Sequence, residues 1–248
     1  MRMLAVALAA TAVAGCATVS PRDRELARAH LALAEQSFAA GDPRGALAEI
    51  ETAVQHDPEN PQVRNLYGLL YHVAFRQNER AIAQYRKAIE LSPDYTEAKV
   101  NLSAVLMDEG RCTEAIPLLE EAKEDLLYRE PYLVHNNLGW CKIQLGETEA
   151  GIRHLQDAVS LNRGFCLGYR NLGEVMEKER RLDEALHFFR SYAQHCPQVA
   201  DAHHRVGLVL LEMGDRAQAR KAFRQCAELK AGELSEQCAR KAGLLGGG

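Results

Sequence analysis

Small residues recur along this chain at a nearly constant spacing. One series consists of Ala34, Gly68, Ser103, Gly139, Gly173 and Gly207, with successive spacings of 34, 35, 36, 34 and 34 residues. A second series keeps almost the same step, at Ala46, Ala81, Ala115, Gly151, Ala185 and Ala219. Two series with one period indicate a repeat architecture, in which each unit buries its apolar face only against its neighbours.

Each unit is predicted to hold two short amphipathic helices. In the second helix a small residue is followed four positions later by a large apolar one, as in Ala81/Tyr85 and Ala185/Phe189, which places both on one helix face. We therefore expect six repeats, at about 27–60, 61–95, 96–131, 132–165, 166–199 and 200–232. A further helix at 233–242 is expected to cover the open end of the last pair, as a solenoid requires.

This pattern resembles the tetratricopeptide repeat (TPR). Prolines stand at unit boundaries and glycines punctuate the turns inside units, namely Pro58, Pro93 and Pro197, and Gly41, Gly110, Gly146 and Gly214. The resemblance implies an all-α fold, a right-handed superhelix of six helix-turn-helix repeats with a C-terminal capping helix, whose first helices line the concave face. Two junctions depart from the pattern, through an extra residue near 75–78 and an extension over 123–131.

The first residues have the pattern of a secretory signal. Arg2 precedes a short apolar run over 3–13, and small residues lead to Cys16. The segment Val13–Cys16 resembles the bacterial lipobox, which implies cleavage after residue 15, acylation of Cys16 (palmitate among the chains) and a tether over 16–23. The absence of Asp after the Cys implies, within that resemblance, an anchor in the outer membrane facing the periplasm. The alternative is an ordinary signal peptide with a chance Cys.

Composition and motifs limit the partners. The formal net charge is −4, with 6% aromatic residues and no basic run, which argues against a nucleic-acid partner. No nucleotide-binding or hydrolase motif is present, so we expect no enzyme, no cofactor and no small-molecule substrate. His203 and His204 are adjacent and point apart on a helix, and no metal site is expected. Partners should be proteins.

Six cysteines remain after Cys16, an even number in a chain that the signal directs to an oxidising compartment. Six cysteines allow 15 pairings. Antiparallel packing within the repeats favours Cys166 with Cys196, Cys112 with Cys141, and Cys226 with Cys238. The alternative is that the cysteines are buried free thiols, because cysteine is a common small core residue.

The candidate binding residues lie on the first helices. Asn101, Asn137 and Asn171 occupy one equivalent position in three successive repeats, and a row of carboxamides can hold an extended peptide backbone. The alternative is that they are tolerated surface residues. Four further candidates share this face, Leu69, Asn136, Trp140 and Arg170, of which Trp and Arg are frequent interface anchors. For Trp140 the alternative is packing between repeats.

The whole architecture, and the run His135–Cys141 in particular, resembles the PilF/PilW/Tgl family of type IV pilus biogenesis lipoproteins, the secretin pilotins. The resemblance implies that the protein binds the type IV pilus secretin subunit and promotes its targeting to the outer membrane and its assembly into a multimer, which supports pilus biogenesis and motility. The alternative is a TPR adaptor of the cell envelope that recruits or regulates peptidoglycan hydrolases.

Overall fold

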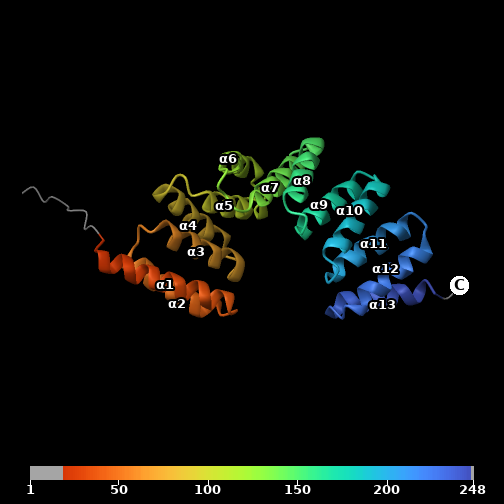
Figure 1. Cartoon of the computed structure of the whole chain (residues 1–248), viewed down its shortest axis with the longest axis horizontal. Helices are drawn as coiled ribbons and strands as arrows, with labels where there is room; N and C mark the ends of the chain where they lie inside the picture. The colour runs from red at the N-terminus through yellow and green to blue at the C-terminus, as the bar shows by residue number, and fades with distance from the viewer. Residues whose placement is uncertain (1–18, 247–248) are drawn as a thin grey trace, which may run out of the picture.

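The computed structural model describes residues 19–246, and in this part of the chain it contains thirteen α-helices. They follow one another as an arch, with α1 and α2 at one end and α12 and α13 at the other (Figure 1). The predicted signal segment and Cys16 lie outside the described residues. None of the helices between residues 19 and 246 has the length and apolar character of a membrane span.

Consecutive helices form six antiparallel pairs followed by one further helix, which confirms the predicted repeat fold. The pairs are α1 (Pro21–Ala39) with α2 (Pro43–His56), α3 (Pro61–Leu69) with α4 (Asn78–Leu91), α5 (Thr96–Asp108) with α6 (Cys112–Lys123), α7 (Pro131–Gln144) with α8 (Thr148–Leu161), α9 (Cys166–Lys178) with α10 (Leu182–His195), and α11 (Ala200–Glu212) with α12 (Arg216–Glu228). Helix α13 (Gly232–Leu244) packs on α12 and buries Cys238 and Ala242, as expected of a cap.

In the second and fifth pairs, the small residue of the first series packs against the large apolar residue of the second helix. A Cβ added to Gly173 of α9 would lie 2.4 Å from the ring of Phe189 in α10, and one added to Gly68 would lie 2.7 Å from the ring of Tyr85. Phe189 and Tyr85 are fully buried. The small residue thus allows the close approach of the two helices, and the large residue fills the space beside it.

The extra residue at the second repeat is accommodated by a change of helix type. Helix α3 continues at its C-terminus as a π-helical turn, η1 (Leu70–Ala74), and Arg76 adopts a φ of 56° before α4 begins. A single inserted residue widens one turn of a helix in this way without displacing the turns on either side. The repeat therefore keeps its register on both sides of the insertion.

The first helix begins earlier than the sequence predicted. Ser20 caps α1 by accepting a hydrogen bond from the backbone N–H of Asp23, and Pro21 occupies the first helical turn. Serine before proline is a favourable helix start because the proline lacks the N–H that the turn would leave unpaired. Residues 21–23 were predicted as part of the tether, because a proline in a short polar segment is typical of a linker. They are helical instead, since this proline begins α1.

Candidate protein-binding surface

The residues that the sequence singled out lie on the first helices of the repeats. In Figure 1, α5 and α9 lie toward the hollow of the arch and their partners α6 and α10 lie outside it. Every candidate is on the first helix of a repeat: Leu69 on α3, Asn101 on α5, Asn136, Asn137 and Trp140 on α7, and Arg170 and Asn171 on α9. Their surroundings differ considerably.

The asparagines bond to one another between repeats. Asn101 Nδ2 donates to Asn65 Oδ1 at 3.0 Å, and Asn171 Nδ2 donates to Asn136 Oδ1 at 2.8 Å. Asn137 accepts from Asn136 Nδ2 at 3.1 Å. Since Asn65, Asn136 and Asn171 are buried, these carboxamides satisfy one another across repeat junctions. The contacts favour a structural role for Asn101 and Asn171 over a row of amides facing a peptide.

The side chains of Trp140 and Leu69 differ in how they pack against the rest of the protein. Leu69 is partly buried and packs against the hydrophobic clusters of repeats one and two and of repeats two to four. Trp140 is half-buried and is not among the side chains that pack on the hydrophobic clusters of the described residues. A tryptophan with one exposed part offers a large apolar contact surface to a partner. Trp140 therefore stays a predicted anchor.

Arg170 belongs to a network of charged residues that joins α9 to α11. Its Nε lies 3.0 Å from Glu174 and 3.6 Å from Asp201, and Arg205 contacts the same two carboxylates at 2.8 and 3.4 Å. Burial raises the pKa of the nearby Glu177, against the opposing effect of Arg205. The guanidinium of Arg170 is therefore already paired, and a partner that used it would have to replace these contacts.

A cleft that the sequence analysis did not identify lies where repeats three and four meet. Its volume is about 640 Å³, and its lining includes three tyrosines and several acidic groups: Asp94, Tyr95, Thr96, Glu97, Asp125, Leu127, Tyr128, Arg129, Glu130 and Tyr132. Burial raises the pKa of Tyr95 to about 12 and also raises that of Tyr128. Both phenols are therefore neutral, and the Tyr95 hydroxyl accepts a hydrogen bond from Asn65 Nδ2 at 3.2 Å.

The segment between α6 and α7 borders this cleft and exposes two adjacent leucines. Leu126 is 94% exposed and Leu127 is 90% exposed. The Asp125 carboxylate holds the segment by accepting from the backbone N–H of Leu127 at 2.9 Å and from the Thr96 hydroxyl at 2.5 Å. The two leucines and the cleft thus form an exposed apolar feature at the junction of repeats three and four. In the sequence, the only sign of this exposed segment was the extended junction at 123–131.

The structure joins the cysteines in the three pairs that the sequence favoured. Cys112 at the start of α6 is bonded to Cys141 in α7, Cys166 at the start of α9 to Cys196 after α10, and Cys226 in α12 to Cys238 in α13. The Cα atoms of these pairs are 5.1, 6.0 and 5.9 Å apart, separations at which a disulfide can form. The first pair links repeat three to repeat four, and the last links the cap to repeat six.

The fold defines a solenoid of the TPR class, whose members are typically protein-binding scaffolds and adaptors. Tetratricopeptide-repeat family models match residues 25–74 and 70–126, and 133–165 and 200–232. The chain belongs to the tetratricopeptide-repeat proteins.

Within this class, the resemblance to TPR proteins of type IV pilus biogenesis is confirmed. The chain is 26% identical over 204 residues to the type IV pilus assembly protein PilF of Pseudomonas aeruginosa, a match that covers 78% of this chain and 80% of PilF. The crystal structure of PilW, a widely conserved type IV pilus biogenesis factor, has the same fold, with a TM-score of 0.78, 22% identity, and coverage of 87% of this chain and 99% of PilW.

A further TPR relative is matched over a smaller share of its own length. The chain is 30% identical over 178 residues to the TPR repeat-containing protein YpiA of Bacillus subtilis, which is 68% of this chain and 40% of YpiA. The chain thus spans well under half of that relative, whereas it spans most of PilF and nearly all of PilW.

Proposed function

We propose that this protein supports type IV pilus biogenesis by binding the pilus secretin subunit and promoting its targeting and multimer assembly at the outer membrane. The observation that carries the proposal is the sequence similarity to PilF, which covers 78% of this chain and 80% of PilF. A likeness that came from single repeats would match any TPR protein in part, as it does YpiA. The match to PilF extends over 204 residues, which is most of both chains.

The exposed apolar groups indicate where a partner would bind. Trp140 lies on the first helix of repeat four, and the exposed Leu126 and Leu127 lie in the segment that leads into the same helix. A secretin subunit that has not yet assembled exposes the surfaces that its multimer will bury. Apolar contacts on repeat four would cover such a surface until neighbouring subunits replace them.

The proposal includes the lipid anchor at Cys16. An acylated N-terminus followed by a short tether confines the arch to the membrane surface, which raises its effective concentration toward a client that inserts there. Replacement of Cys16 (Cys16→Ser) should abolish acyl labelling and move the protein from the membrane fraction to the soluble fraction. Retention in the outer membrane without acylation would contradict this part of the proposal.

A binding titration with purified secretin subunit tests the function. The variants are Trp140→Ala and the double variant Leu126→Ser/Leu127→Ser, and Leu244→Ser in α13 is the matched control, because Leu244 is also highly exposed but lies at the far end of the arch. We expect at least one of the two repeat-four variants to weaken binding about tenfold or more, a loss of about 1.4 kcal/mol or more. Equal affinity in all variants would refute the proposed surface.

The same titration separates the two function classes. If the wild-type chain shows no affinity for the secretin subunit but binds a peptidoglycan hydrolase, the adaptor function would replace the one proposed.

A further inference from the structure

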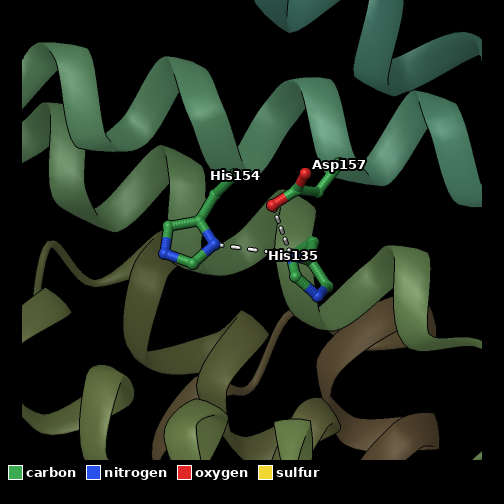
Figure 2. Close-up of side chains that lie close together, drawn as sticks. All are labelled: His135, His154 and Asp157. Atoms are coloured by element: carbon green, nitrogen blue, oxygen red, sulfur yellow. Dashed lines mark hydrogen bonds and ion pairs between the residues drawn. The ribbon is translucent and has the colours of Figure 1, made fainter.

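Two histidines and an aspartate converge between the helices of repeat four. His135 extends from α7, and His154 and Asp157 extend from successive turns of α8 (Figure 2). The Nδ1 atoms of the two histidines are 3.4 Å apart, and His135 Nδ1 is also 3.4 Å from the Asp157 carboxylate. The three donor atoms all lie within 4.8 Å of one another.

The equivalent position in repeat one holds an ordinary pair. His30 in repeat one has the register of His135 and bonds to the Glu49 carboxylate at 2.7 Å. Glu49 has the register of His154, so in repeat four a second imidazole replaces the acid that would pair with the first. Repeat four adds the Asp157 carboxylate one turn further on. The result is three potential ligand groups within 4.8 Å of one another, where repeat one has a hydrogen-bonded pair.

Two of the three separations fit the coordination geometry of zinc. A tetrahedral ion with Zn–N and Zn–O bonds of about 2.0–2.1 Å places its ligand atoms about 3.3 Å from one another. Two of the three separations in repeat four are 3.4 Å, and all three are within 4.8 Å. We propose that His135, His154 and Asp157 bind a divalent transition-metal ion of the zinc class, with water at the fourth position.

The environment of the three residues allows an ion to enter. The Asp157 side chain is 58% exposed, while that of His135 is 20% exposed, so the site opens to solvent on the aspartate side and is enclosed on the histidine side. Imidazole nitrogens are preferred ligands of zinc, and a carboxylate completes mixed sites of this kind. A bound ion would cross-link α7 to α8 in the repeat that carries Trp140, and so fix the position of the helix that presents it.

Calorimetric titration of ZnCl₂ into the untagged full chain, previously freed of metal by a chelator, tests the proposal at pH 7.5. We expect one ion per chain for the wild type. Asp157→Asn and His154→Ala should each weaken binding by about tenfold or more, because each removes one of three protein ligands. His30→Ala is the matched control, since it removes a histidine from the same register in repeat one, and it should leave zinc affinity unchanged.

A second measurement reports on the ligands directly. Co²⁺ substituted for zinc should give the visible absorption of a tetrahedral ion in the wild type and in His30→Ala. This absorption should be lost in Asp157→Asn. Because Asp157 is exposed, its replacement should not disturb the fold, and the loss would report on the ligand itself. No zinc binding by the wild type, or equal zinc affinity in His154→Ala and His30→Ala, would overturn the proposal and leave a hydrogen-bonded histidine pair.

Discussion

The close approach of helices within a repeat makes a sharp prediction at Gly173. In Gly173→Ala the new Cβ would lie 2.4 Å from Cε1 and 2.5 Å from Cδ1 of Phe189, well inside the 3.5–4.0 Å at which carbon atoms attract. Phe189 is fully buried, so its ring can move only by displacing the core of repeats five and six. The substitution therefore forces either the ring or the helix pair to shift.

The magnitude follows from two opposing effects. Overpacking a well-packed core costs about 1–3 kcal/mol, and a contact this short with a buried ring belongs near the upper end. Replacing glycine by alanine inside a helix stabilises the folded state by about 1 kcal/mol through helix propensity. The net destabilisation should be about 2 kcal/mol, which for a chain of this length lowers the Tm by about 4–8 °C.

Gly243→Ala in α13 is the matched control. It is the same substitution in a helix, but an added Cβ there has no heavy atom within 4 Å. It should therefore leave the Tm unchanged or raise it slightly. Thermal unfolding followed by circular dichroism compares the two, and amide hydrogen exchange shows whether the loss is confined to repeat five. A Gly173→Ala protein as stable as Gly243→Ala would refute the packing argument.

Three further predictions concern the bonds described above. Replacing Cys112 and Cys141 together by serine should destabilise the chain by about 3 kcal/mol, the effect expected of a loop of this length, and peptide mapping without reductant should recover the pair from the native protein. Asn136→Ala should cost about 1–3 kcal/mol in chemical denaturation, because it leaves the buried amide of Asn171 without its acceptor, and a smaller loss would mean that water replaces it. The pKa of Asp125 is lowered, chiefly by the hydrogen bond from the Thr96 hydroxyl and then by that from the Leu127 N–H. The ionised carboxylate therefore stabilises the segment at pH values above the ordinary pKa of 3.8. This stabilisation is lost as the pH falls through the lower pKa of the folded state. An NMR titration of the Asp125 carboxyl that gave 3.8 or higher would contradict it.

The repeat fold could be predicted because its determinants are periodic. The positions of Gly173 and Phe189 each recur six times, and a pattern of this kind identifies the helix pairs and the contacts between them. The cysteine pairs could also be proposed from the sequence, because antiparallel packing brings the start of one helix close to the end of the next. The start of α1 at Pro21 was missed, since a serine–proline cap is a local signal that does not repeat.

Features that depend on side-chain contacts between repeats could not be predicted in the same way. Asn65 was overlooked because its partner Asn101 lies 36 residues away, and the period alone does not say which amides will bond. The two exposed leucines were visible only as an irregular junction. His135 and His154 come from different helices, 19 residues apart, and no short metal-binding motif spans that distance.

The measurement that tests the central claim most directly is the state of the type IV pilus secretin in outer membranes of the host, with and without this gene. Heat-resistant multimers are separated from monomers by gel electrophoresis and detected with one antibody. The proposed function predicts that deletion removes the multimer while monomer persists, and that the wild-type gene restores it. An unchanged amount of multimer in the deletion strain would contradict the account.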